Sequence, residues 1–191
     1  PWETGQHCCP LAKEVNMYWN LFWTAWGWAA ILADNEGISA AVLPTPYPLT
    51  TLYKNIESTG HKARLIAIND NSQTLVNKFR SYYEGALIED WEVKLRLDTF
   101  SPFSRQVMEL VHTIPYGQTI TYADAARAVG KPGAARAIGQ VMKRNPMPLI
   151  VPCHRVIASN GPGGFTSPGG VQTKLKMLQW ERQNLALKKL R

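Results

Sequence analysis

The sequence predicts an α+β protein made of two parts. The chain has 191 residues, enough for one large domain or two small ones with a buried core. Short runs rich in β-branched and aromatic residues fill the first half, and they predict a small α/β domain with a short, mainly antiparallel sheet. The second half has the apolar spacing of helices, which predicts a mainly helical domain. We place the two domains at residues 1–99 and 100–191.

The charge divides along the same boundary. Residues 1–100 carry 8 Lys/Arg and 11 Asp/Glu, a net charge of −3, whereas residues 101–191 carry 13 and 3, a net charge of +10. Such a basic module is typical of a polyanion partner, most often nucleic acid, although charge can also serve solubility alone. Hydrophobic residues make up 45% of the chain, which excludes a disordered tail. Three cysteines exclude a disulfide framework and suit a reducing compartment.

An uncharged stretch over residues 15–33 approaches the length of a membrane span. The polar Asn20 inside it and a turn at Thr24–Gly27 favour two antiparallel strands instead, at Met17–Trp23 and Trp26–Ala33. We therefore expect no membrane partner, and no secretory signal stands out before this stretch.

A turn at Asp34–Gly37 should lead into a third strand at Ile38–Leu43. Prolines at 44, 46 and 48 then interrupt regular structure. The rest of this half is expected to contain a helix at Thr50–Ser58, a strand at Arg64–Ile68, a helix at Ser72–Tyr83 and a half-exposed strand at Trp91–Leu97.

Four helices are expected in the basic half. The first, Ser101–Thr113, begins with Ser-Pro, a favourable helix start. Two short helices follow at Tyr122–Val129 and from Gly133 to about Arg144, around a tight glycine turn. In a basic module this pair suggests a helix-turn-helix, while an ordinary helical hairpin has the same pattern. The last helix, about Gln172–Leu187, should bury a stripe made of Val171, Leu175, Leu178 and Leu185.

The second short helix opens with small side chains around a single arginine: Ala135, Arg136, Ala137 and Gly139. A reader of the major groove would present several amide, hydroxyl or guanidinium groups there. Small side chains instead let a helix backbone press into a widened minor groove, where Arg136 could enter the base stack. Tight helix packing with Arg136 in a salt bridge is the alternative.

An apolar segment between prolines delivers Cys153, followed by His154 and Arg155. Adjacent cationic side chains lower the pKa of a thiol and raise its thiolate fraction, which is the nucleophilic form. In an extended backbone, neighbouring side chains point to opposite faces, so His154 would need a bridging water or a turn to act on Cys153. The bland alternative is an inert core cysteine.

A loop rich in glycine and proline, residues 158–170, can approach a ligand closely. Beyond it, Glu181 lies at the edge of the expected stripe of the last helix. Glu181 could hold an imidazole in one tautomer, as the orienting carboxylate of a triad does, or it could be a solvated surface carboxylate.

Together these motifs strongly resemble the O6-alkylguanine-DNA alkyltransferases, also called methylated-DNA–protein-cysteine methyltransferases. The resemblance covers about residues 100–181. It rests on Tyr116–Tyr122 (YGQTITY), Ala135–Gly139 (ARAIG), Asn145-Pro146, Ile150–Val156 (IVPCHRV), Gly163–Phe165 (GGF), Lys174 and Glu181, which occur in the family's order. It implies direct DNA repair, in which each molecule once takes a methyl or other alkyl group from O6 of guanine onto its own cysteine.

The resemblance also implies the catalytic roles. Cys153 would accept the alkyl group, and His154 would act through water as its base while Glu181 holds His154. Asn145 would brace the turn that carries the reactive segment. Tyr122 would crowd the phosphate of the flipped nucleotide and donate a proton toward the guanine ring. No cofactor and no metal are implied.

The partner implied is double-stranded DNA that contains O6-alkylguanine, bound in the minor groove with little dependence on sequence. Arg136 would fill the gap left by the flipped nucleotide, beside Ala135, Ala137, Gly139 and Tyr122. The base pocket would be walled by Gly163, Gly164, Phe165 and Thr166, and the backbone carbonyls of Cys153 and Val156 would read the guanine amino group. We expect a monomer in the cytoplasm, or in the nucleus of a eukaryote.

The sequence departs from the family pattern between Phe165 and Lys174, where Ser167-Pro168 is the expected insert. Whether Thr166 or Ser167 donates to the substrate therefore stays open. A regulatory module without chemistry and a cysteine hydrolase are the competing functions, and the intact cysteine motif opposes the first. A zinc site at His7, Cys8 and Cys9 is not expected, because adjacent cysteines fit ligand spacings poorly.

Overall fold

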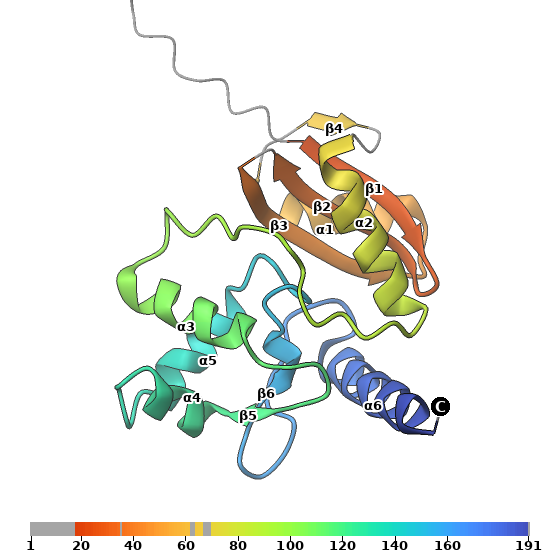
Figure 1. Cartoon of the computed structure of the whole chain (residues 1–191). Coiled ribbons are helices and arrows are strands. Elements are labelled where there is room, and N and C mark those ends of the chain that lie inside the picture. The colour runs from red at the N-terminus through yellow and green to blue at the C-terminus, as the bar shows by residue number, and fades with distance from the viewer. Residues whose placement is uncertain (1–17, 35, 62–63, 67–69, 191) are drawn as a thin grey trace, which may run out of the picture.

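The structure is a computed structural model that describes residues 18–34, 36–61, 64–66 and 70–190. Its first part is a four-stranded sheet in the order β3-β2-β1-β4 (Figure 1). The strands β1 (Tyr18–Thr24), β2 (Gly27–Asp34) and β3 (Gly37–Thr45) are antiparallel neighbours, and the short β4 (Arg64–Ile66) runs parallel to β1. The α+β class predicted from the sequence is confirmed.

Both predicted turns of the sheet are present. At the first turn, Gly27 has φ +120°, and a Cβ there would lie 2.2 Å from the carbonyl oxygen of Thr45. At the second, the Asp34 carboxylate accepts backbone hydrogen bonds from Glu36 (2.8 Å) and Gly37 (3.1 Å). The uncharged stretch of the sequence thus contains a β-hairpin, as predicted. Among the described residues, no helix has both the length and the apolar character needed to cross a membrane.

Two helices cover opposite faces of the sheet (Figure 1). Because side chains alternate along a strand, Trp19 and Leu32 pack with Leu52 of α1 (Leu49–Ser58), whereas Phe22 packs with Phe79 of α2 (Asp70–Tyr83). The second face continues into the other half of the molecule. Buried apolar residues of both halves form one cluster there, so the division at residues 99–100 stays a prediction.

The prediction of a strand at Trp91–Leu97 was wrong. This segment makes one bridge with β3, through hydrogen bonds of Ile38 to Lys94 and Arg96 at 2.9 Å each. Glu92 has φ +49°, a left-handed conformation that interrupts an extended ladder. The segment therefore lies along the edge of the sheet without forming a strand.

The second half has the helices expected of it. The elements are α3 (Pro102–His112), β5 (Ile120–Thr121), α4 (Tyr122–Ala128), α5 (Ala135–Lys143), the 3-10 turn η1 (Cys153–Arg155), β6 (Val156–Ile157) and α6 (Gly170–Lys189). Ser101 caps α3 by accepting the Ser104 amide, and Thr121 caps α4 by accepting the Asp124 amide. The pair α4 and α5 lies where the helix-turn-helix was predicted, and that classification stays a prediction.

The buried face of α6 differs from the predicted stripe. Leu178 is buried as expected, but Leu175 is 42% exposed, and Lys174, Met177 and Glu181 are buried instead. The reason is that α6 turns two ionisable side chains inward, where buried partners satisfy them. Hydropathy alone assigns such residues to the surface.

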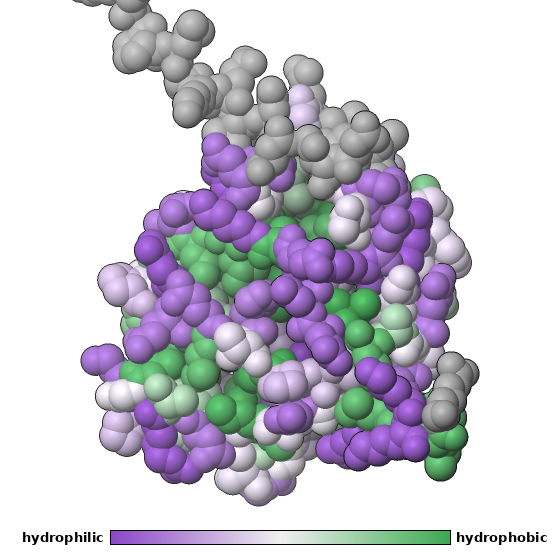
Figure 2. All heavy atoms as spheres, in the orientation of Figure 1, coloured by the Kyte–Doolittle hydropathy of each residue, from purple (hydrophilic) through white to green (hydrophobic). Residues whose placement is uncertain are grey.

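Hydrophilic side chains cover much of the face shown in Figure 2, with smaller hydrophobic areas between them. Only a few large apolar side chains among the described residues are strongly exposed, with Tyr47 at 65% and Leu190 at 84%.

Candidate active site

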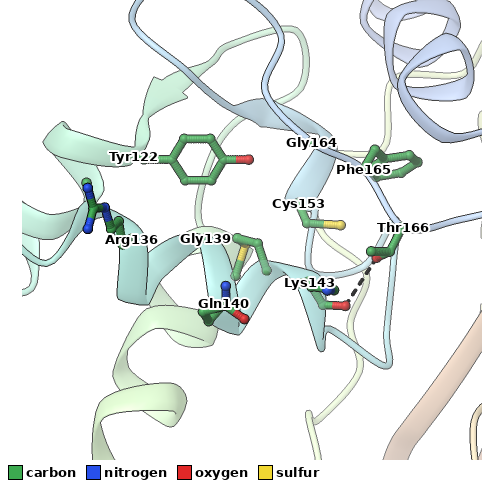
Figure 3. A pocket seen from close by; sticks show the side chains of 11 residues that line it. Tyr122, Arg136, Gly139, Gln140, Lys143, Cys153, Gly164, Phe165 and Thr166 are labelled. Carbon is green, nitrogen blue, oxygen red and sulfur yellow. Dashed lines mark hydrogen bonds between the residues drawn. The ribbon is translucent and has the colours of Figure 1, made fainter.

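A cavity of about 680 Å³ opens between α5 and the loop that follows β6 (Figure 3). Its walls come from four stretches of chain: the start of α4, one side of α5, the turn η1 and the glycine-rich loop. The lining residues are Tyr122, Ala135, Arg136, Gly139, Gln140, Met142, Lys143, Cys153, Gly164, Phe165 and Thr166. All of these lining residues belong to the basic half.

Helix α5 presents one face to this cavity. Positions 135–136, 139–140 and 142–143 recur at the helical period, while Ile138 points into the core. Gln140, Met142 and Lys143 were not among the predicted site residues, although the period starting from Ala135 would have identified them. Ala137 is exposed and does not line the cavity, so its predicted contact with DNA stays a prediction.

The segment that leads to Cys153 is held by side chains on both sides. Asn145 donates from Nδ2 to the Val151 carbonyl (2.8 Å) and accepts the Met147 amide at Oδ1 (3.0 Å). His112 Nδ1 lies 2.8 Å from the Ile150 carbonyl oxygen. Leu149 is fully buried with φ +78°, a strained conformation that surrounding packing must maintain. Asn145 is thus placed to brace this segment, the task that the resemblance implied.

Cys153 begins the 3-10 turn η1, so the extended backbone considered for it is replaced by a turn. Its side chain is only 6% exposed, yet it forms part of the cavity wall, and its sulfur is visible there in Figure 3. A nucleophile in this position can be reached only by an atom that enters the cavity.

The expectation that adjacent cationic side chains lower the pKa of the Cys153 thiol was wrong for the resting protein. Burial raises that pKa, and Asn145, the Lys174 ammonium and nearby backbone offset this only in part. The neighbours do not supply free positive charge: burial lowers the pKa of His154, and Arg155 is paired with Glu181. The thiol is therefore largely protonated at neutral pH.

His154 and Glu181 form a buried pair, with Nε2 2.8 Å from Oε1. Burial raises the pKa of Glu181, but hydrogen bonds and charge from His154 and Arg155 outweigh it and lower the pKa to about 2. Because Glu181 is ionised, the neutral imidazole carries its proton on Nε2 and has its lone pair on Nδ1. Nδ1 is buried and has no hydrogen-bond partner among the described residues, so His154 is free to accept a proton there.

Three further donors satisfy Glu181, and sequence reasoning did not identify them as such. Arg155 donates from Nη2 to Oε1 (2.8 Å) and from Nε to Oε2 (3.0 Å), the Gly117 amide donates to Oε2 (2.8 Å), and the Tyr82 hydroxyl donates to Oε1 (2.9 Å). Glu181 is the centre of a buried network and not a solvated carboxylate. No sequence pattern signals these contacts, because the donors come from three distant parts of the chain.

Lys174 is the second buried charge of α6. Its ammonium donates to the carbonyls of Val156 (2.6 Å) and Gly164 (3.3 Å), which ties the glycine-rich loop to β6. Burial lowers the pKa of Lys174 to about 8, although the nearby Cys153 opposes this shift. Lys174 therefore remains mainly cationic at neutral pH, within electrostatic reach of the thiol.

Tyr122 stands at the cavity wall with its hydroxyl toward the side where Cys153 lies (Figure 3). Burial, followed by the charge of Cys153, raises the pKa of Tyr122, so its hydroxyl stays a proton donor. Gly163 has φ +73°, and a Cβ there would lie 2.8 Å from the Tyr122 ring. Gly163 thus packs behind this ring and, like Val156, does not line the cavity itself.

The far wall is closed by Thr166, whose hydroxyl donates to the Lys143 carbonyl of α5 (3.1 Å, dashed in Figure 3). Gly164, Phe165 and Thr166 line the cavity, whereas Ser167 lies in a neighbouring groove, and the role of the cavity as a base pocket stays a prediction. The Thr166 hydroxyl is therefore already engaged by the backbone of α5.

Among the described residues, no group of three or more His, Cys, Asp or Glu side chains could hold a metal ion. His7, Cys8 and Cys9 lie outside the described residues.

Comparison with known proteins places this site in context. The family model of the DNA-binding domain of 6-O-methylguanine DNA methyltransferase matches residues 102–183. A probable methylated-DNA–protein-cysteine methyltransferase of Acanthamoeba polyphaga mimivirus is 43% identical over 104 residues, which cover 54% of this chain and 67% of that protein. A methylated-DNA–protein-cysteine methyltransferase of Metallosphaera sedula is 37% identical over 113 residues, covering 59% of this chain and 69% of the relative.

Solved structures agree over more of the chain. The O6-methylguanine methyltransferase of Mycobacterium tuberculosis superposes with a TM-score of 0.67 at 26% identity, covering 88% of this chain and 94% of that one. M. tuberculosis OGT in complex with DNA has the same TM-score and identity, covering 87% and 94%. The likeness therefore includes both halves of the described fold.

Proposed function

This chain belongs to the family of methylated-DNA–protein-cysteine methyltransferases, and from this we propose that Cys153 is the acceptor to which it transfers an alkyl group from O6 of guanine. Membership makes it a DNA-repair methyltransferase with DNA as its partner. The observation that carries the assignment of the acceptor is the sulfur in the cavity wall, next in sequence to a neutral histidine with an unoccupied, buried lone pair.

The reaction is a single in-line displacement. His154 Nδ1 takes the thiol proton through one bridging water, and the sulfur attacks the alkyl carbon. A C–S bond forms as the C–O bond breaks, and the electron pair leaves on guanine, which is protonated on the ring by Tyr122. Because the resting thiol is protonated, this proton transfer accompanies substrate binding. A thioether has no easy route back to thiol, so each molecule reacts once, without a cofactor.

The target base must leave the helix to reach a nearly buried sulfur, which costs a few kcal/mol. We propose that α5 enters the minor groove with Ala135 and Gly139, which allow close approach, and that Arg136 fills the vacancy in the base stack. Ala137 would lie against the DNA beside them. Contacts of basic side chains with phosphates make binding largely independent of sequence and sensitive to salt. The chain would act as a monomer, in the cytoplasm or a eukaryotic nucleus.

Mass spectrometry tests the acceptor. The protein is mixed with a duplex that contains one O6-methylguanine, and we expect one added methyl per chain, located on the Cys153 peptide. The matched variant Cys153→Ser should gain none and leave the oligonucleotide unchanged. Turnover beyond one methyl per chain would indicate a hydrolase, and strand binding without any methyl gain would indicate a regulatory module; either result overturns the proposal.

A further inference from the structure

Two neighbouring tyrosines at the end of α2 differ in the hydrogen bonding of their hydroxyl groups. Tyr82 and Tyr83 are both buried, with exposed fractions of 0% and 1%. The Tyr82 hydroxyl donates to Glu181 Oε1 at 2.9 Å across 99 residues of sequence. The Tyr83 hydroxyl is also buried, but it has no hydrogen-bond partner among the described residues. Tyr82 is thus hydrogen-bonded to Glu181, whereas Tyr83 lies near this carboxylate without a hydrogen bond to it.

The Tyr82 ring is fixed by its surroundings. It packs edge-on against Tyr83 and Tyr116, with ring centroids 4.9 and 5.7 Å away, and its backbone carbonyl accepts the Trp180 indole N–H at 3.0 Å. Burial raises the pKa of Tyr82 well above its ordinary value, so the hydroxyl keeps its proton. Tyr82 is therefore a permanent and oriented donor to the carboxylate.

Glu181 Oε1 is shared between Tyr82 and His154. It lies 2.9 Å from the Tyr82 hydroxyl, 2.8 Å from His154 Nε2 and 2.8 Å from Arg155 Nη2. A donor that binds a carboxylate oxygen spreads its negative charge and weakens its attraction for another donor. The phenol and the imidazole therefore compete for the same oxygen.

We propose that Tyr82 is a positioning residue for alkyl transfer, which orients Glu181 and, through it, limits the basicity of His154. The inference rests on the proposed function of Cys153. It assigns to the first half of the chain a direct part in the chemistry of the second.

The charges around this pair determine the sign of the effect. Glu181 faces Arg155, Tyr82, Tyr83 and Tyr116, while His154 faces Glu181 and the cations of Arg155 and Lys174. Removing the Tyr82 hydroxyl leaves a stronger acceptor on Glu181, which favours the imidazolium and raises the pKa of His154. A protonated His154 cannot accept the thiol proton, so the rate must be lost at a higher pH than in the unaltered protein.

The experiment compares Tyr82→Phe with Tyr83→Phe, which removes a hydroxyl from the adjacent buried ring. Single-turnover methyl transfer from an O6-methylguanine duplex is timed between pH 5.5 and 8.5. For Tyr82→Phe we expect the acid-side midpoint to rise by about one pH unit, so that the rate at the lowest pH tested, relative to the same variant's rate at pH 8, falls below that of the unaltered protein. Tyr83→Phe should keep the ratio of the unaltered protein. General loss of structure would lower the rate at every pH and leave the ratio unchanged.

Two further arms keep the test decisive. In a Glu181→Gln background, Tyr82→Phe should have no additional effect on the ratio. Incorporation of 3,5-difluorotyrosine at position 82, a more acidic donor with the ring retained, should move the midpoint in the opposite direction. Equal ratios in Tyr82→Phe and Tyr83→Phe would overturn this inference and leave the proposed function intact. Absence of methyl transfer to Cys153 in the unaltered protein would instead overturn the proposed function.

Discussion

The reactive cysteine illustrates how a single residue depends on groups distant in sequence. The adjacent His154 and Arg155 look activating, but both are bound to Glu181, and burial raises the pKa of the Cys153 thiol. Lys174 is a cation that acts on the thiol and has no carboxylate partner in its described contacts, because two carbonyls hold its ammonium. Its charge lowers the thiol pKa in part. Replacing Lys174 therefore tests how a nearby positive charge affects ionisation of the Cys153 thiol.

Replacing Lys174 by methionine should make the thiol harder to ionise. Loss of the cation raises the pKa of Cys153, and we expect iodoacetamide to alkylate Cys153 about tenfold more slowly at pH 7.5, with the rate profile moved to higher pH. The control is Lys176→Met, an exposed lysine on the same helix that stacks on Trp26 at 3.8 Å. An unchanged profile in Lys174→Met would show that its charge does not act on the thiol.

At the scale of elements, α5 performs two tasks with one sequence. Ile138 and Met142 anchor it in the core, while Gly139 lies on the cavity side, where a Cβ would meet only the Tyr122 ring at 4.0 Å. Arg136 is exposed at the start of the helix, one end of the cavity (Figure 3). The two faces make α5 a wall of the cavity and, in the proposed function, the helix that meets DNA.

Arg136→Ala should slow methyl transfer from a duplex much more than reaction with the free base. Without a side chain to fill the stack, methyl transfer from a duplex should slow about tenfold or more, because flipping is no longer offset. Reaction with the free base O6-methylguanine should change less than about twofold, since it needs no flipping. Arg182→Ala, which removes an exposed arginine from α6, controls for net charge. Equal slowing with both substrates would contradict the stacking role.

On the scale of the whole molecule, the network around Glu181 joins the two halves. Tyr82 comes from the sheet part, Gly117 from the loop after α3, and His154 and Arg155 from the reactive turn. Backbone contact of Ala41 with the Pro146 carbonyl at 2.8 Å adds a second connection next to Asn145. Glu181 thus also connects the two halves of the fold, so its protonation should affect folding stability.

The free energy of unfolding should fall in acid because Glu181 becomes protonated. Its pKa is about 2 in the folded protein and ~4.3 in an unfolded chain, so the ionised form favours folding. This contribution, about 3 kcal/mol, is present above pH 4.3 and is lost as the pH falls toward 2. In urea unfolding at pH 7, Glu181→Gln should lower the free energy of unfolding by about 3–5 kcal/mol, because Arg155 stays buried without its partner. Between pH 4.5 and 2.5, the free energy of unfolding of this variant should depend less on pH than that of the unaltered protein. Glu109→Gln, an exposed carboxylate on α3, should retain the original dependence. The same acid loss in both variants would show that Glu181 does not carry it.

Much of this fold can be predicted from residues that lie close together in the sequence. The hairpin strands follow from their uncharged aromatic runs, α3 and α4 from their Ser101 and Thr121 caps, and the cavity wall from the helical period of α5. Each depends on residues a few positions apart, where propensity, capping and turn chemistry act. The cysteine motif likewise indicated its family, because its signature is contiguous.

Other features depend on contacts between segments that are distant in the sequence. Sequence reasoning left open whether Glu181 is an orienting or a solvated carboxylate, predicted a half-exposed strand at residues 91–97, and expected neighbouring cations to activate the thiol. Burial brings His154, Tyr82 and Arg155 to Glu181 and raises the pKa of the thiol, while the left-handed Glu92 interrupts the expected strand. Desolvation and long-range hydrogen bonds depend on which surfaces are packed together, and no short stretch of residues contains that information.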